Sequence, residues 1–152
     1  VPTGRYNMDR QVGEAIQAQL AAVGIRANIV GPEISSYLST LSQAKAPMFL
    51  GGKGSPTGDM DFTQTLSNGS TGRMNHFNFK NPQVDQLILQ LRVAVDPGER
   101  RKVLDDLQGL VYREAPHVTL YYEDQLWAAL KTVHDVRVYV NEFVNFGAAW
   151  KS

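Results

Sequence analysis

The sequence contains no cysteine among its 152 residues. Disulfide bonds, thiolate metal sites and a cysteine nucleophile are therefore excluded. An excess of charge of either sign is also missing, because 15 basic residues balance 15 acidic ones. A neutral chain has no basic field to attract nucleic acid or an anionic lipid surface, so nucleic acid is not expected as a partner. Long apolar runs are absent too, and no segment of about 18 residues is expected to span a membrane.

What the sequence does contain is typical of a globular protein. Hydrophobic residues make up 43% of the chain and charged residues 20%. A chain of this length can bury roughly two-thirds of its unfolded surface, so residues 1–152 are expected to form a single domain. The first residue is Val1 rather than Met, which favours a chain that was processed or excised from a longer one.

A glycine-rich stretch from Met48 to Phe62 is the most distinctive part of the sequence. The apolar run Met48 to Leu50 is typical of a buried strand, and glycines and small polar residues follow it. Open α/β sheets bind ligands beyond the carboxyl ends of their strands. A ligand-binding loop and an ordinary surface turn are both consistent with this pattern.

Nucleotide binding is disfavoured at this loop. A phosphate-binding loop needs glycine at the position of Pro47 and serine or threonine at the position of Gly54. A dinucleotide fingerprint that starts at Gly52 and Gly54 lacks its third small residue, because Thr57 stands in that place.

Apolar residues at helical spacing predict helices that start near residues 9, 34, 62, 82 and 97. Two of these starts carry strong signals. Asn81 followed by Pro82 is an N-cap with proline at the first helical position, and Asp96-Pro97 with Glu99 resembles a capping box. Gly24 is expected to end the first helix.

Alternating or β-branched runs predict strands at residues 25–30, 48–50, 118–122, 125–130 and 136–140. Strands that alternate with helices at this spacing favour β-α-β units. The sequence therefore predicts an α/β fold with a mixed, largely parallel sheet flanked by helices.

Catalytic chemistry has only a weak basis in the sequence. Asp59 and Asp61 would suit a metal site or an acid–base pair, but no nearby residue completes a metal-ligand spacing, and one of them is expected to cap the helix before Phe62. The enzymatic alternative is a small hydrolase that uses Asp59, Asp61 and His76. No Gly-x-Ser-x-Gly motif occurs. No metal or cofactor is expected.

A third possibility is a protein-interaction module. The tail after Val140 is rich in apolar residues without helical spacing, and such a surface is unfavourable when exposed. A partner would bind this tail, whereas the glycine loop would be unimportant.

The order of short motifs resembles the C-terminal lobe of periplasmic solute-binding proteins that serve peptide/nickel-type ABC transporters. No single motif is diagnostic, but the ordered series covers about Gly4 to Leu130. The matching segments are Gly4-Arg5-Tyr6 with Asp9, Val12 to Leu20 with Val23-Gly24-Ile25, Tyr37-Leu38, Gly51-Gly52, Asn81-Pro82 with Val84-Asp85-Leu87, Asp96-Pro97 with Arg100-Arg101, and Glu114-Ala115-Pro116 leading to Leu120-Tyr121-Tyr122 and Trp127-Ala128.

The resemblance implies one lobe of a two-lobed binding protein and therefore a fragment of a longer chain. Members of this family are not enzymes. They capture peptides or, in some branches, nickel chelates, sugars, opines or glutathione in the cleft between the lobes, and deliver them to ABC permease subunits. The resemblance implies a periplasmic or extracellular location, with the remaining lobe, the permease and a peptide-like or other small polar solute as partners.

The resemblance also implies that the glycine loop lines the cleft. Gly51, Gly52 and Gly54 would let the backbone approach the ligand. Lys53 would pair with a ligand carboxylate and Asp59 or Asp61 with a ligand amine. The other predicted ligand-binding residues are Ser55, Thr57 and Asn75. Family members often have tryptophan where this chain has Lys53, and peptide binders often have an aspartate near the position of Pro56, so this chain departs from the peptide-binding pattern at both positions.

Overall fold

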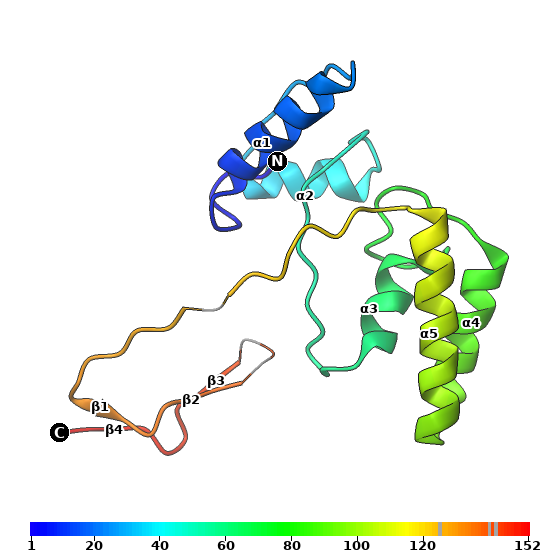
Figure 1. Ribbon diagram of the computed structural model, residues 1–152. Coiled ribbons are helices and arrows are strands. Elements are labelled where there is room, and N and C mark those ends of the chain that lie inside the picture. Colours follow the sequence, from blue (N-terminus) through cyan, green and yellow to red (C-terminus); the bar gives the residue numbers. More distant parts are fainter. Residues whose placement is uncertain (125, 140, 142) are drawn as a thin grey trace.

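The computed structural model describes residues 1–124, 126–139, 141 and 143–152. Figure 1 shows three parts: two helices at the N-terminal end, three helices packed side by side, and a long extended segment that leads to short strand pairs at the C-terminus. The elements are α1 (Asp9–Ala22), α2 (Ile34–Ser42), α3 (Met60–Ser67), α4 (Pro82–Val93), α5 (Pro97–Glu114), β1 (Val133–His134), β2 (Arg137–Val138), β3 (Val144–Asn145) and β4 (Trp150–Lys151).

The hydrophobic core lies between α4 and α5, with α3 packed beside α4. Its side chains recur at helical spacing on the facing sides of the two helices, as the sequence predicts. The buried core residues are Val84, Ile88, Leu91, Leu107, Leu110 and Val111, and Phe79, Leu87, Val103 and Leu104 pack against them. We call α3, α4 and α5 the helical unit.

The predicted helix starts of the helical unit are confirmed. The Asn81 side chain accepts hydrogen bonds from the backbone N–H groups of Gln83 at 2.9 Å and Val84 at 3.3 Å. Asp96 accepts one from the Glu99 N–H at 2.8 Å. These side chains satisfy N–H groups that have no partner within the helix.

The N-terminal part also ends its first helix as predicted. Gly24 has a φ of +84°, a backbone conformation that glycine adopts without strain. The Gly24 N–H donates to the Ala21 carbonyl at 3.0 Å and the Ile25 N–H to the Leu20 carbonyl at 2.9 Å, which is a Schellman motif. In α2, Tyr37 and Leu41 are buried.

The predicted parallel sheet is not confirmed. Segments 25–30, 48–50 and 118–122 form no strand ladder, and the only strands among the described residues are two antiparallel pairs, β1 with β4 and β2 with β3. Their registers place Val133 opposite Lys151 and Val138 opposite Val144. Alternation gives a segment one apolar and one polar face, but a ladder also needs a neighbouring strand. For these three segments the described residues supply no such neighbour. Gln125 and Val140, which belong to two predicted strands, lie outside the described residues.

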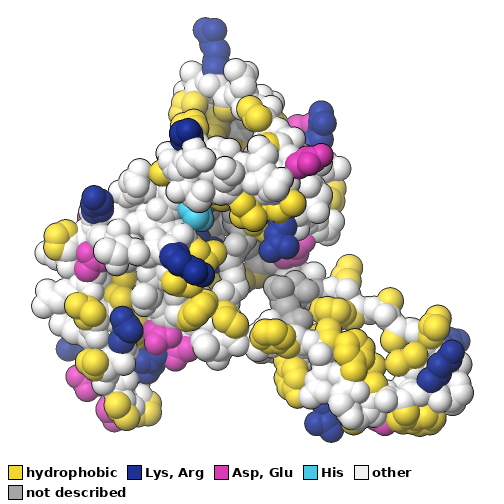
Figure 2. Space-filling model, turned by 180° about the vertical axis from the view of Figure 1, so that it is seen from behind, with side chains coloured by type: hydrophobic (Ala, Val, Ile, Leu, Met, Phe, Trp, Pro, Cys, Tyr) yellow, Lys and Arg dark blue, Asp and Glu magenta, His cyan; other side chains and the backbone are white. Residues whose placement is uncertain are grey.

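Consequently the chain after α5 carries many uncovered apolar side chains. Tyr122 is 93% exposed and Leu126 is 88% exposed. Figure 2 shows hydrophobic side chains over much of the C-terminal part. None of the helices within the described residues has the length and apolar character needed to cross a bilayer.

Candidate functional site

The glycine loop folds back on itself through its own small side chains. The Ser55 hydroxyl donates to the Asp59 carbonyl at 2.7 Å, and the Thr57 hydroxyl oxygen accepts a hydrogen bond from the Asp59 N–H at 3.2 Å. Between them Gly58 turns the chain with a φ of +72°. Two of the predicted ligand-binding hydroxyls therefore shape the turn before α3.

The first glycines of the loop lie against aromatic rings. The Gly52 N–H donates to the Tyr6 hydroxyl at 2.8 Å, and a Cβ atom at Gly52 would lie 2.7 Å from the Tyr6 ring. A Cβ atom at Gly51 would lie 3.2 Å from the Phe49 ring. Only glycine therefore permits this packing at position 52, whereas Gly54 has open space around it.

Asp59 and Asp61 sit at the start of α3 and share one basic partner. Asp59 caps the helix by accepting a hydrogen bond from the Asp61 N–H at 3.0 Å, which confirms the predicted acidic cap. Arg100 Nη2 in α5 lies 2.6 Å from an Asp59 carboxylate oxygen and 3.7 Å from one of Asp61. The Asp61 N–H and the Arg100 guanidinium lower the pKa of Asp59.

Arg100 links three helices, a role that local pattern does not reveal. Its Nη1 donates to the Leu91 carbonyl of α4 at 2.6 Å, while its Nη2 binds Asp59. The Asp59 and Asp61 carboxylates therefore help to hold α3 against α4 and α5 through Arg100. Among the described residues, no group of three or more histidine, aspartate or glutamate side chains is placed to hold a metal ion.

Asn75 is fully engaged by backbone groups. Its Nδ2 donates to the Gly69 carbonyl at 3.0 Å and the Phe79 carbonyl at 2.7 Å, and its Oδ1 accepts a hydrogen bond from the Phe79 N–H at 2.9 Å. The side chain fixes the connection between α3 and α4. It positions the neighbouring residues His76 and Phe77.

Lys53 belongs to a cluster of basic and aromatic side chains from three distant segments. Its Nζ lies 5.4 Å from the centre of the Phe77 ring. The ring centres of Phe49 and Phe77 are 6.3 Å apart, those of Phe49 and His76 are 6.1 Å apart, and those of Phe77 and His117 are 6.1 Å apart. We call Phe49, Lys53, His76, Phe77 and His117 the basic–aromatic cluster.

The pKa values in this cluster reflect burial and shared positive charge. Burial of the ammonium end lowers the pKa of Lys53 to about 8, although the residue as a whole is exposed. Burial lowers the pKa of His76 and of His117, and the nearby Lys53 charge lowers both further. Burial therefore disfavours the charged form of all three groups, and the Lys53 charge adds to this effect at the two histidines.

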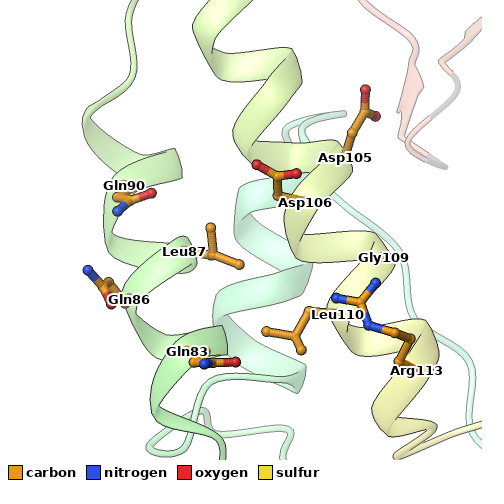
Figure 3. Close-up of a pocket in the computed structure, with 9 residues that line it drawn as sticks. All are labelled: Gln83, Gln86, Leu87, Gln90, Asp105, Asp106, Gly109, Leu110 and Arg113. Carbon is orange, nitrogen blue, oxygen red and sulfur yellow. The ribbon is translucent and has the colours of Figure 1, made fainter.

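A separate hollow of about 440 Å³ is lined by residues of α4 and α5. Figure 3 shows Leu87 and Leu110 between the two helices, with glutamine side chains of α4 and charged side chains of α5 around them. The hollow contains none of the residues predicted for ligand binding, and its lining belongs to the edge of the α4–α5 core.

Comparison with known proteins identifies similar sequences. No known family profile matches the chain. Nickel-binding protein NikA of Staphylococcus aureus is 29% identical over 136 residues, which is 89% of this chain and 27% of that protein. Glutathione-binding protein GsiB of Escherichia coli strain K12 is 24% identical over 137 residues, or 84% of this chain and 27% of that protein.

A solved structure shares the fold. The unliganded open form of MppA, a periplasmic murein tripeptide binding protein, matches with a TM-score of 0.58 and 17% sequence identity, over 73% of this chain and 22% of that one. The chain is thus similar to solute-binding proteins of the peptide/nickel type.

The relation to the solute-binding proteins confirms the resemblance drawn from the ordered motifs. The chain spans about a quarter of the length of the curated relatives it matches. The relatives are named for three different solutes, so the relation does not select one of them.

The structure brings together only part of the predicted site. Lys53 extends from the loop to Phe77. The other predicted polar side chains form hydrogen bonds or ion pairs within the protein, namely Ser55, Thr57, Asp59, Asp61 and Asn75. Sequence reasoning missed His117 as a neighbour of the loop. No sequence signal could have found it, because it lies just beyond α5 and far from Lys53 along the chain.

Proposed function

We propose that the chain is part of the solute-binding component of an ABC importer, which captures a small polar solute in a cleft between two lobes and delivers it to permease subunits. The glycine loop from Gly51 to Asp61 would line this chain's side of the cleft. The proposal includes a periplasmic or extracellular location and no enzymatic activity. The observation that carries it is the match to two binding proteins along 84% or more of the chain.

The local structure gives this proposal a physical mechanism. Tyr6 and the first glycines hold the loop backbone close to aromatic rings, and Gly54 leaves open space beside Lys53. Ser55, Thr57 and Asp59 stiffen the loop by hydrogen bonds within it. A loop that is rigid before binding loses less conformational entropy when a ligand arrives. Closure of the lobes on the solute would be a hinge motion, and a ligand that prefers the closed form would shift that equilibrium.

Two other functions explain fewer of the observations. A hydrolase that uses Asp59, Asp61 and His76 would need these groups to cooperate, but both carboxylates pair with Arg100 while His76 packs against Phe49. An interaction module would use the exposed apolar tail. Deleting the residues after Val140 would then abolish partner binding while the loop stayed intact.

Thermal unfolding of the full-length protein with a panel of solutes tests the proposal. The panel contains di- and tripeptides, glutathione, chelated nickel, oligosaccharides and opines. A ligand at a hundred times its dissociation constant should add about 2.7 kcal/mol to the free energy of unfolding. The absence of a shift with every class at millimolar concentration would overturn the proposal. Residues 1–152 alone should bind weakly, and micromolar binding by them would contradict the two-lobe mechanism.

A loop variant makes the same experiment specific. Gly54→Trp should remove the ligand-induced shift because the indole ring would fill the open space beside the loop, and it should leave the unliganded stability nearly unchanged. Gln108→Trp, on the exposed side of α5, is the matched control and should keep the shift. An unchanged shift in Gly54→Trp would place the solute elsewhere.

A further inference from the structure

The basic–aromatic cluster has no acidic partner among the residues that the structure describes. The ion pairs of the described residues lie outside the cluster. They join Arg10 to Glu14, Arg100 to Asp59 and Asp61, and Arg101 to Asp105. The two carboxylates closest to Lys53 in sequence are thus already used by Arg100. Within the described residues, no carboxylate therefore lies within ion-pair distance of Lys53.

Such an arrangement is unfavourable for the folded protein taken alone. Moving an ammonium group out of water disfavours its charged form, and the Lys53 charge in turn disfavours protonation of His76 and His117. Groups perturbed by burial and by a specific charged neighbour occur often at functional sites, where a ligand supplies the missing interaction. The cluster fits this situation because Lys53 and His117 remain exposed to solvent along part of their side chains.

The cluster also offers an apolar surface next to the basic groups. The rings of Phe49 and Phe77 are stacked with an interplanar angle of 25°, and both side chains are half-buried. Lys53 and His117 both border Phe77.

We propose that Lys53 and His117, both beside Phe77, bind the carboxylate of a small solute whose apolar part packs on Phe49 and Phe77. The Lys53 ammonium and an imidazole N–H of His117 would each donate a hydrogen bond to a carboxylate oxygen. His76 acts as a positioning residue, since its ring packs against the edge of Phe49. The inference rests on the proposed solute-binding function and specifies the chemical class of the solute.

Matched pairs of probes test the inference on the full-length protein. Tripeptides such as Ala-Phe-Ala are titrated by calorimetry beside their C-terminal amides, and maltotriose serves as an uncharged solute of another class. The free acid should bind at least about tenfold more tightly than the amide, because the amide lacks the charged oxygens that Lys53 and His117 would contact.

Variants connect the preference to the named residues. Lys53→Gln and His117→Phe should each weaken binding of the free acid by about tenfold and leave binding of the amide unchanged. Lys102→Gln, an exposed lysine on α5, is the matched control and should change neither. His76→Gln should weaken both probes equally, since the inference gives it no contact with the carboxylate.

Three outcomes would overturn the inference and leave the proposed function standing, and a fourth would overturn both. Equal binding of acid and amide would refute carboxylate recognition while the solute-binding function stood. Binding of maltotriose alone would do the same. Binding of inorganic phosphate with the same affinity as the tripeptide acid would show a general anion site instead. If no solute of the wider panel bound, the proposed function itself would fail, and the inference with it.

Discussion

The helical unit and the chain after α5 contain similar apolar residues but use them in opposite ways. In the helical unit Val84 and Leu107 are fully buried. In the chain after Pro116, Val118 is 79% exposed and Tyr122 is 93% exposed. Both segments have an apolar pattern, so the pattern alone does not decide burial.

The difference lies in how each kind of element satisfies its backbone. A helix pairs its N–H and C=O groups within itself, and two helices joined by a short connection bury each other's apolar faces. A strand needs a neighbour for its ladder and a second layer for its face. The chain from 82 to 114 contains both helices and their connection, whereas segment 118–122 has no neighbouring strand among the described residues.

The largest expected effect comes from deleting a core side chain. Leu107→Ala should lower the free energy of unfolding by about 2 to 5 kcal/mol, because it leaves a cavity among packed side chains. Leu126→Ala, at a position that is 88% exposed, should change it by no more than about 0.5 kcal/mol. Urea unfolding of both variants, followed by circular dichroism, measures the contrast.

Equal losses of unfolding free energy in Leu107→Ala and Leu126→Ala would contradict the contrast between the helical unit and the chain after α5. That result would mean that Leu126 is buried in the full-length protein, so that the chain after α5 has a covering which the described residues do not supply.

A middle-sized effect is expected at the arginine that joins the three helices. Arg100→Ala should lower the melting temperature clearly, since it removes hydrogen bonds to the Leu91 carbonyl and the Asp59 carboxylate. Its neighbour Arg101 is the control, because its ion-pair partner Asp105 is exposed and its replacement by alanine should cost at most about 0.5 kcal/mol. Thermal unfolding distinguishes them, and a reversed order would refute the linking role of Arg100.

The smallest effect concerns Lys53, which lies in the loop before α3 and contacts Phe77. Its pKa is about 8 in the folded protein against 10.5 for an ordinary lysine, so the unfolded chain binds more protons between these pH values. Stability should therefore rise with pH across this window, and the charge penalty is fully present below pH 8.

Lys53→Gln lacks this titration, which makes it the reference. The stability of the wild type relative to this variant should increase between pH 8 and about 10.5, by less than about 1 kcal/mol because the side chain is partly solvated. Melting temperatures of both proteins across this range check the sign. A constant difference would show that the ammonium end is fully hydrated.

Much of the helical structure could be predicted from local sequence. Asn81-Pro82 and Asp96-Pro97 mark their helix starts because the capping chemistry involves only residues within one turn. Gly24 ends α1 for an equally local reason. The sheet could not be predicted in the same way, because a suitable pattern at residues 25–30 says nothing about whether a partner strand lies beside it.

The candidate site divides along the same line. The glycine loop and the acidic cap at Asp59 follow from adjacent residues. The pairing of Asp59 with Arg100 and the approach of His117 to Phe77 depend on how α5 packs. These contacts join residues that are far apart in the sequence, and no spacing rule connects them.

The sequence by itself determined where most helices begin and end and which loop is rich in glycine, since short-range chemistry carries this information. Its ordered motifs also indicated which binding proteins the chain resembles. Only the tertiary structure decided that the carboxylates of the loop serve Arg100 and that Lys53 lies among Phe77, His76 and His117 without an acidic partner in the described part of the chain. The physical reason is that hydrogen bonds within a turn are fixed by neighbouring residues, whereas charge pairing and burial depend on which distant segments the packed helices bring together.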